Sequence, residues 1–323
     1  MLDTSNDRSF PPYEMLDQYV SAGTEKMRKL ERLYHNTQAH AWDPRAVLDA
    51  LEAKHGGIHM PAEKREAVGH LFSVLVWGEL AAWNIAADLA RWLPDLDARM
   101  AATGQVFDEA RHFHVLRDYL RRADIPMPPL NPYGRRLLER ILGTGSMLQK
   151  LYGMQLLVEN LALAIFRRLA ASNVEPVLTE LLEYVERDES RHVALGVLYL
   201  PRLLARTTTL ERARNWAFNT ELFLLTIAGG QLLDAHFQTM GLDHRELGHV
   251  SMRLHQQVIK QMEEEHGVTN GEHVRGVYGL SRKQQTALVD FLHPKNVSTM
   301  TARHRRALDV FDRFVRLGAR AMS

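Results

Sequence analysis

Two copies of one pentapeptide hold the side chains of this sequence that are best suited to chemistry. Both copies have the pattern Asp-Glu-x-Arg-His and occupy residues 108–112 and 188–192. A single glutamate precedes the glutamate of each copy by 30 residues. Four glutamates and two histidines therefore stand in two matching halves, namely Glu79, Glu109 and His112, and Glu159, Glu189 and His192. A set of this kind holds two metal ions between carboxylates in the core of a four-helix bundle.

The spacing of the first half places its two glutamates at one level of a helical hairpin. We predict one long helix over residues 61–92 and a second over residues 95–123, with Pro94 in the turn between them. Glu79 lies 15 residues before Pro94, and Glu109 lies 15 residues after it. In an antiparallel hairpin both glutamates then lie ~22 Å from the turn, because a helix rises about 1.5 Å per residue.

The second half repeats this geometry. Glu159 and Glu189 are equally distant from residue 174, which lies in a predicted turn at residues 172–176. Within each pentapeptide the glutamate and the histidine are three residues apart and share a helix face. Glu79 and Glu159 have strongly apolar neighbours in the sequence, and a carboxylate buried there without a partner is very costly. Two divalent cations would balance the four carboxylates, and oxygen and imidazole ligands without thiolate favour Fe or Mn.

A Glu-x-x-His pair is weak evidence when it stands alone. The same spacing also occurs at Glu52 and His55, at Glu246 and His249, and at Glu263 and His266. These three pairs lie in polar stretches, so we predict solvated helix faces for them. The longer duplicated string, with a glutamate at the same offset each time, points to a shared site. The alternative is a pair of buried salt-bridge networks without metal.

The remaining polar residues of the two strings are predicted to support the ligands. A metal-bound imidazole usually donates its second N–H to a carboxylate, which fixes its orientation. Asp108 directly precedes Glu109 and so points to a neighbouring helix, which predicts a crosswise arrangement. The expected pairs are Asp108 with His192 and Asp188 with His112. The arginines that would neutralise these aspartates are Arg111 and Arg191, whose alternative role is that of surface residues.

Composition narrows the classes of protein that are possible. The chain has 323 residues, and 40 Lys and Arg against 39 Asp and Glu give a net charge of +1. Near neutrality gives no reason to expect nucleic acid or an anionic membrane as a partner. The absence of cysteine excludes disulfides, thiolate ligands and iron–sulfur clusters. We find neither a secretory signal nor an apolar run of about 18 residues, so a cytoplasmic protein without membrane contact is expected.

The hydrophobic pattern is helical nearly everywhere, which predicts an all-α protein. We expect a single helical domain over residues 1–323, with a four-helix core at 60–206 and accessory helices at 207–323. Residues 125–134 are rich in proline and are predicted to form a loop, and residues 267–279 are predicted to be irregular. The other expected helices cover about residues 13–33, 43–56, 147–171, 177–206, 209–240, 243–265, 281–293 and 299–320.

On these motifs the chain resembles the ferritin-like superfamily, in its ribonucleotide-reductase-small-subunit-like branch. The doubled motif is most similar to the hydroxylase subunits of bacterial multicomponent di-iron monooxygenases and to acyl-carrier-protein desaturases. Both families use a glutamate followed by (Asp/Glu)-Glu-x-Arg-His, twice. The run RHFHVLRDYL at residues 111–120 is similar to the desaturases, and DESRHVALG at 188–196 to the monooxygenases. The resemblance covers about residues 60–206.

The resemblance implies that the six residues bind two iron ions, or a Mn/Fe pair, and that O₂ is a co-substrate. It implies oxygenation or desaturation of a small or lipid-like organic substrate, an external electron donor such as a reductase or ferredoxin, and a possible homodimer. The alternatives are an iron-handling or peroxide-detoxifying protein and a radical-generating subunit of the reductase type. Leu116 stands where those reductase subunits carry a radical tyrosine, Leu163 where the hydroxylases have a threonine, and Val185 where arylamine N-oxygenases add a histidine.

Further residues are candidates for a substrate cavity beside the metals. Gly229 and Gly230 could open a channel or allow close helix packing, and we favour packing. The amphipathic helix at 299–320 is expected to cap the bundle rather than bind a partner. Aromatic and methionine side chains could line the cavity, with ordinary core packing as the alternative, and these are Trp77, Trp83, Phe107, Met154 and Phe166.

Overall fold

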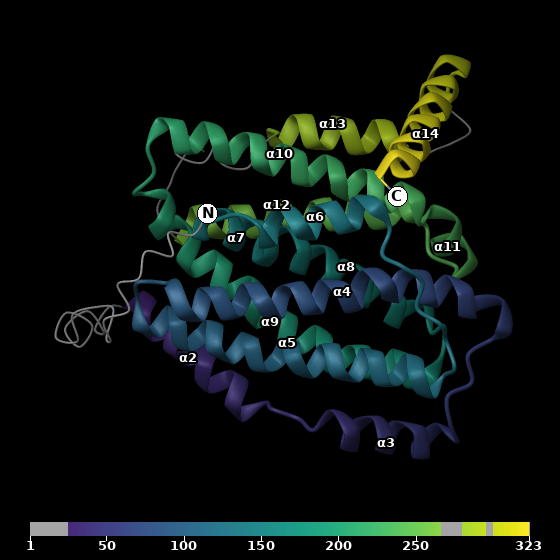
Figure 1. Ribbon diagram of the computed structural model, residues 1–323, viewed down its shortest axis with the longest axis horizontal. Coiled ribbons are helices and arrows are strands. Elements are labelled where there is room, and N and C mark those ends of the chain that lie inside the picture. Colours follow the sequence, from purple (N-terminus) through teal and green to yellow (C-terminus); the bar gives the residue numbers. More distant parts are fainter. Residues whose placement is uncertain (1–24, 266–279, 295–299, 323) are drawn as a thin grey trace.

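Four long helical segments form the centre of the protein. The computed structural model describes residues 25–265, 280–294 and 300–322, and within these ranges every regular element is a helix. Helix α4 (Ala62–Trp92) packs along α5 (Leu96–Arg122), and α8 (Glu159–Ser172) packs along α9 (Pro176–Leu204). Contacts between α5 and α9 join the two hairpins. Figure 1 shows these helices running nearly parallel to the long axis of the molecule. The predicted all-α bundle is confirmed.

The first hairpin forms where the sequence predicts it. Pro61 lies directly before α4, where its missing N–H costs no helical hydrogen bond. Helix α4 ends at Trp92, and α5 begins at Leu96 after Pro94 and Asp95. The predicted turn at Pro94 is therefore present, and it fixes the relative level of the residues on α4 and α5.

The second hairpin contains an irregularity that the sequence did not reveal. The helix predicted over residues 147–171 consists of α7 (Met147–Leu151), a π-helix η1 (Tyr152–Val158) and α8. Asn173 follows in the left-handed conformation with φ 45°, which ends α8. The side chain of Glu175 then caps α9 by accepting from the backbone N–H of Leu178.

Two other predictions need correction, and two lie partly or wholly outside the described residues. The proline-rich segment was expected to be a loop through residue 134, but α6 (Pro132–Leu142) begins within it because Asn131 caps Gly134 and Pro132 occupies the first turn. The helix expected over 209–240 is divided at Leu233 into α10 (Thr209–Leu232) and α11 (Asp234–Thr239). The first helix is α2 (Glu25–Ala39), and the residues expected to precede it lie outside the described ranges, as does the segment 267–279.

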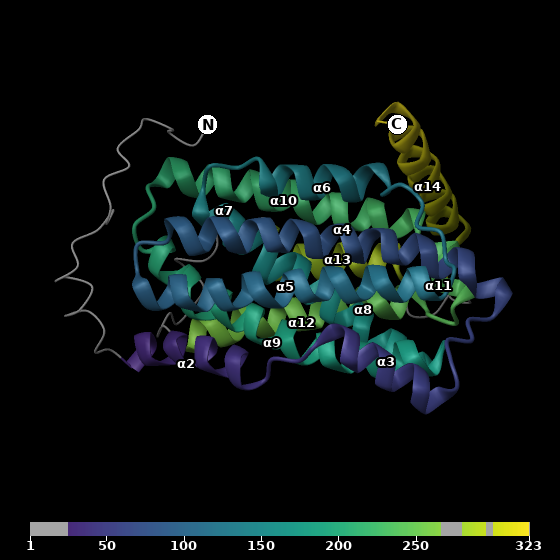
Figure 2. The ribbon, with the colours of Figure 1, turned by 60° about the horizontal axis from the view of Figure 1, so that its bottom comes forward.

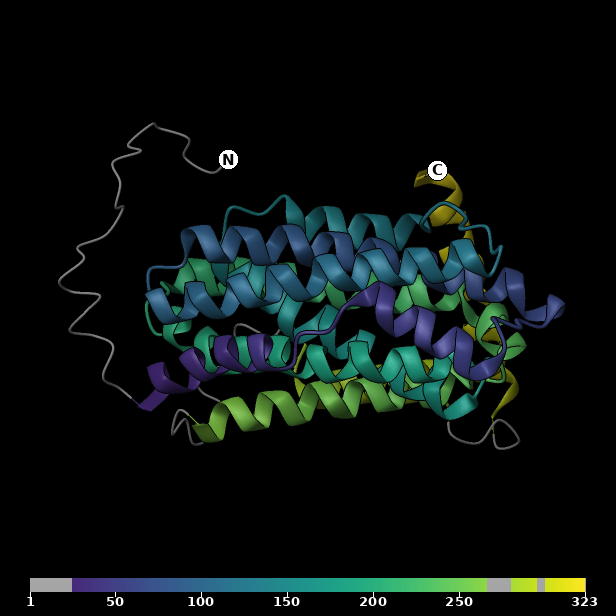
Figure 3. The ribbon, with the colours of Figure 1, turned by 90° about the horizontal axis from the view of Figure 1, so that it is seen from below.

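Accessory helices surround the central four. Helices α2 and α3 (Pro44–His55) lie along α5 and α9, whereas α12 (His244–Glu265) contacts α8 and α9. Figure 2 shows α6 and α10 above α4, and Figure 3 shows α12 running along the lower edge. Helix α13 (Arg282–Leu292) packs on α12, and α14 (Ala302–Met322) packs against α6 and α10 at one end. Within the described residues, no helix combines the length and the hydrophobicity that a membrane span needs.

Candidate metal centre

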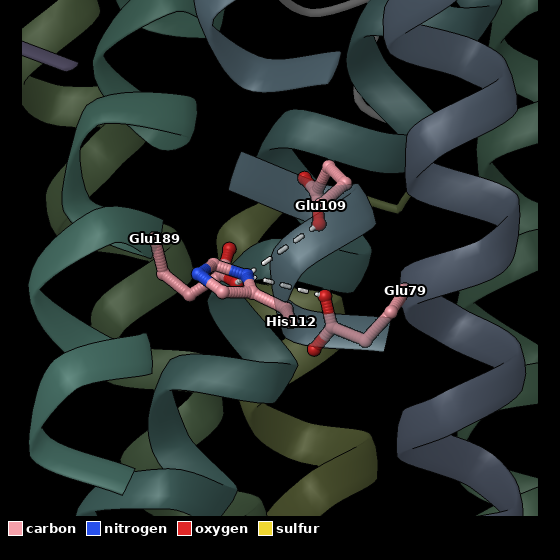
Figure 4. Close-up of side chains that lie close together, drawn as sticks. All are labelled: Glu79, Glu109, His112 and Glu189. Carbon is pink, nitrogen blue, oxygen red and sulfur yellow. Dashed lines mark ion pairs between the residues drawn. The ribbon is translucent and has the colours of Figure 1, made fainter. Parts of the chain in front are cut away.

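The six predicted ligands meet in the middle of the bundle. Two groups of side chains each bring four ligand atoms within 4.8 Å of one another. Both groups contain Glu109 from α5 and Glu189 from α9. All of the participating residues are buried. Beyond the shared pair, the first group contains Glu79 and His112, and the second contains Glu159 and His192. Figure 4 shows the first group.

The two histidines present the same nitrogen to the carboxylates. Nδ1 of His112 lies 3.0 Å from Oε1 of Glu189 and 3.4 Å from Oε2 of Glu79. Nδ1 of His192 lies 3.0 Å from Oε1 of Glu109 and 3.0 Å from Oε2 of Glu189. Figure 4 shows the imidazole of His112 lying among the three carboxylates. The two halves of the sequence motif therefore produce two similar nitrogen and oxygen sites.

Unpaired polar atoms test whether this cluster fits metal ions. Within the described residues, Nδ1 of His112, Oε2 of Glu109 and Oε1 of Glu189 have no hydrogen-bond partner, although all three are buried. The short distance between His112 and Glu189 is thus not an aligned hydrogen bond. Buried polar atoms are nearly always paired, and a divalent cation between these atoms would supply the missing partner. The residues fit a pair of metal ions.

Two aspartates lie behind the histidines, in the predicted crosswise arrangement. Nε2 of His112 donates to Oδ2 of Asp188 at 3.2 Å, and Nε2 of His192 lies 3.4 Å from Oδ2 of Asp108. Each contact runs between α5 and α9. Because a carboxylate can only accept at neutral pH, the proton is fixed on Nε2 and Nδ1 is directed to the cluster.

Two arginines neutralise this pair of aspartates. Nη2 of Arg111 donates to Asp108 at 2.5 Å and to Asp188 at 2.6 Å. Nη2 of Arg191 donates to the same two carboxylates at 2.8 and 2.7 Å. The side chain of Arg111 is only 3% exposed, so Arg111 is not a surface residue.

Two supporting residues were missed from the sequence. Trp42, in the segment between α2 and α3, donates its Nε1–H to Asp188 at 2.7 Å and lies under the guanidinium of Arg111. Gln105 donates to Glu109 at 2.8 Å and to Glu159 at 3.0 Å. The position of Gln105 one turn before Glu109 was an available signal, whereas nothing in the sequence marks Trp42.

The π-helix leads directly into the metal level. Element η1 ends at Val158, and Glu159 is the first residue of α8. Single π turns inside α-helices occur often at functional sites, because the extra residue changes the direction of the side chains that follow. Helix α9 approaches η1 closely at Gly196, where a Cβ atom would lie 2.8 Å from Cβ of Gln155. Only glycine allows this approach.

The cluster carries an electrostatic imbalance in the absence of cations. Burial, and then the charge of Glu189, raise the pKa of both Glu79 and Glu159 well above the ordinary value. Burial alone would lower the pKa of His112, but hydrogen bonds beginning with that to Asp188 raise it overall. Protons thus compensate the buried carboxylates, and metal ions that bind here would displace them.

One cavity lies next to the cluster on the side of α4 and α8, and a larger cavity adjoins it. The smaller one is lined by Glu79 and Glu159 and by apolar residues of α4 and α8. The larger one, with a volume of about 1000 Å³ including its opening to solvent, lies among α8, α10, α12 and α13. Both cavities are lined by Val74, Leu161 and Ile165. An apolar wall of three side chains therefore separates the pocket at the carboxylates from the larger cavity among the accessory helices.

The residues proposed from sequence to line a cavity do not line either of these two cavities. None of Trp77, Trp83, Phe107, Met154 and Phe166 is among the described residues that line these two cavities. Trp77 and Phe107 each stand two residues before a cluster glutamate, which turns them to the opposite face of the helix, and they are 42% and 55% exposed. Met154 and Phe166 are core residues. Gly229 and Gly230 both line the larger cavity, and Gly230 also packs closely on His244.

A buried histidine at this cavity gives a prediction about stability. Burial, and then the neighbouring His244 and His249, lower the pKa of His293 to about 4. The pKa of a histidine in an unfolded chain is about 6.5. Between this value and the folded value of about 4, the unfolded chain binds more protons than the folded protein. The stability that His293 contributes is complete above pH 6.5 and is lost as the pH falls through about 4. We expect H293N to reduce the fall in unfolding temperature across this window, in contrast to H35N at an exposed position.

Several solved structures have an architecture similar to that of this protein. No protein-family model matches the chain, and no curated protein matches it significantly. The structure is similar to that of a protein from Synechococcus with aldehyde deformylating oxidase activity, at 22% identity and a TM-score of 0.54, over 71% of this chain and 97% of that one. It is also similar to an R2-like ligand-binding oxidase reconstituted with a Mn/Fe cofactor, at 17% identity and a TM-score of 0.58, over 78% and 98%.

The fold is ferritin-like. Both similar structures are matched over nearly their whole length, so the helical hairpins and most of their surroundings are shared. At sequence identities of 22% and 17% the similarity establishes the fold alone. The chemistry therefore has to be argued from the residues of the site.

Proposed function

We propose that the protein is a di-metal oxidoreductase that uses O₂ to oxidise an apolar organic substrate. The observation that carries this proposal is the pair of buried four-residue groups that share Glu109 and Glu189. Their position beside a largely apolar cavity supports a substrate rather than storage of iron. The fold that the chain shares with oxidases, one of them with a Mn/Fe cofactor, adds support.

The geometry suggests a role for each ligand. Glu109 and Glu189 would bridge two metal ions, because only these two residues belong to both groups. Each metal would then have one further carboxylate and one imidazole. The terminal pairs would be Glu79 with His112 and Glu159 with His192. Two iron ions, or a Mn/Fe pair, would supply the activation of O₂.

The protein's own residues would orient the ligands and exclude water. Asp108 and Asp188 hold the imidazoles with Nδ1 inward, and Arg111 and Arg191 compensate their charge. The apolar walls at Leu161 and Ile165 would keep solvent from the reacting carbon. Electrons would come from an external donor, a reductase or a ferredoxin. A homodimer and a cytoplasmic location remain parts of the proposal.

Metal content and reaction with O₂ test the proposed function. The purified chain is loaded with Fe(II) without oxygen and then mixed with O₂ while the visible spectrum is recorded. We expect about two metals per chain and a transient absorption band. Oxidation without a transient, followed by continued uptake of iron, would favour the iron-handling alternative. Failure to bind metal after reconstitution would exclude both.

A larger side chain in the wall between the two cavities is expected to impair turnover without loss of metal. Leu161 lines both cavities. We propose that the substrate passes between them at this side chain, and L161W would block that route. With decanal as probe, chosen because a similar structure has aldehyde deformylating oxidase activity, we expect substrate-dependent O₂ consumption to fall about tenfold or more. Metal content should not change. L210W, at a leucine that is 60% exposed, is the control, and equal activity of the two variants would contradict this route.

A further inference from the structure

The larger cavity has a polar end that is remote from the metal level. Its inner wall contains Val74, Leu161 and Ile165, which it shares with the pocket at Glu79 and Glu159. Its outer wall includes residues of α13, which packs on α12. Figure 1 shows α13 and α10 on one side of the molecule and α5 and α9 on the other. The cavity therefore extends from the apolar wall that it shares with the pocket at Glu79 and Glu159 to residues of α13.

The outer wall contains a buried amide oxygen without a partner. Gln285 lines the cavity from α13, and the residue is only 2% exposed. Nothing among the described residues donates a hydrogen bond to its Oε1. Buried polar atoms are rarely left unpaired, because the loss of hydration is not repaid. A ligand that donates a hydrogen bond here would repay it.

His244 stands in the same wall and is paired with an aspartate. Its Nδ1 lies 3.3 Å from Oδ1 of Asp234. Its Nε2 lies beside Gly230, 2.9 Å from the place that a Cβ atom would occupy there, and both His244 and Gly230 line the cavity. Gln285 therefore supplies the unpaired acceptor of this wall.

The cavity is unsuited to a charged group. None of the described residues that line it is Lys, Arg, Asp or Glu. His293, also in the wall, is kept neutral because burial and the nearby histidines lower its pKa to about 4. An ammonium or a carboxylate would lose its hydration here without a counter-charge. A neutral donor such as a hydroxyl loses much less.

We propose that the outer end of this cavity binds a terminal hydroxyl group of an otherwise apolar chain, which donates its hydrogen bond to Oε1 of Gln285. The rest of the chain would extend along Leu161 and Ile165 to the metal level. The assignment of the opposite end as the reacting end rests on the proposed function. The contact with the hydroxyl depends only on the cavity, and it identifies an uncharged, long-chain alcohol as the class of ligand.

Two probes that differ in one hydrogen-bond donor test this contact. 1-Decanol and decyl methyl ether have the same chain, but only the alcohol can donate. Isothermal titration of the metal-free protein is expected to give about three- to tenfold tighter binding of the alcohol. In Q285L the two affinities should become equal. T226V is the matched control, since Thr226 lines the same cavity but already donates to the carbonyl of Leu222 at 2.9 Å.

The outcomes separate this proposal from the proposed function. Equal binding of both probes by the parent protein, or an unchanged preference in Q285L, would overturn the hydroxyl site even if the protein binds metal and reduces O₂. A preference that depends on Gln285 in a protein without metal activity would leave the site intact and remove the proposed function. Q285M, which keeps an unbranched side chain, serves the same comparison if Q285L does not fold.

Discussion

Replacing Glu189 with alanine is expected to prevent the stable loading of both metal positions. Glu189 belongs to both four-residue groups, so its loss removes one ligand from each. The remaining ligands of each group are two carboxylates and one histidine. The parent protein should retain about two metals per chain after desalting, whereas E189A should retain well under one. Elemental analysis of protein reconstituted with Fe(II) measures the difference.

The comparison with terminal and surface glutamates makes this prediction specific. Glu79 belongs to one group only, so E79A should weaken one position and leave the other loaded. Glu183 is exposed on the same helix as Glu189, and E183A should retain the full metal content. Equal metal content in E189A and E183A would show that Glu189 does not bridge. Loss in E79A as complete as in E189A would argue against two distinguishable positions.

Metal should also stabilise the parent protein and not the variant. In the metal-free parent, burial and then the charge of Glu189 raise the pKa of Glu79 and Glu159, so these carboxylates destabilise the folded state. E189A removes one of these charges, so the metal-free variant should unfold at a temperature equal to or above that of the metal-free parent. Addition of Fe(II) under anaerobic conditions should raise the unfolding temperature of the parent alone. Poor folding of the variant is thereby separated from loss of ligation.

The sequence was sufficient to predict the hairpins and the meeting of the six residues, because both follow from regular geometry. Glu79 and Glu109 are equidistant from Pro94, and the constant rise of a helix converts this into one level. The crosswise contact of Asp188 with His112 followed from the position of each aspartate directly before a ligand glutamate, which turns it toward the neighbouring helix. Duplication provided a second, independent instance of each relation.

Features that depend on irregular backbone or on distant segments were not predictable in this way. The π-helix before Glu159 has no distinctive residue, since YGMQLLV fits an ordinary helix. Trp42 reaches Asp188 across 146 residues of sequence, so no local spacing connects them. The cavity was misjudged because its walls come mainly from α10, α12 and α13, whereas the candidates were sought beside the motifs.

Replacing Asp188 with alanine is expected to cost more stability than any other change in the hydrogen-bonded network behind the metals. Asp188 accepts hydrogen bonds from Trp42, Arg111, Arg191 and His112. Removal of one partner from a buried ion pair leaves the other charge without compensation and costs about 3–5 kcal/mol. Burial would raise the pKa of Asp188, but the hydrogen bond from His112 and further donors lower it overall.

Because the pKa of Asp188 is lowered, it determines the pH at which stability should be measured. The stability that a carboxylate with a lowered pKa contributes is fully present above its unfolded pKa of about 3.9 and declines as the pH falls toward the folded value. Urea unfolding of the metal-free protein near pH 7 therefore captures the whole effect, and the absence of metal removes any contribution from ligation. The free energy of unfolding should be highest for the parent, intermediate for D188N and lowest for D188A, since asparagine keeps the shape and one acceptor oxygen but loses the charge.

A variant at Trp42 provides a control with a smaller expected effect on the same hydrogen-bonded network. W42F removes a single donor to Asp188 at 2.7 Å and should cost only about 1 kcal/mol. In the double variant the two losses should not add, because the tryptophan has no acceptor left once Asp188 is gone. If D188A cost no more than W42F, water would have to reach Arg111, whose side chain is 3% exposed, and a closed network would be the wrong description. A full cost that survives in the R111M background would instead assign the effect to Trp42, His112 and Arg191, because D188A then removes only their contacts.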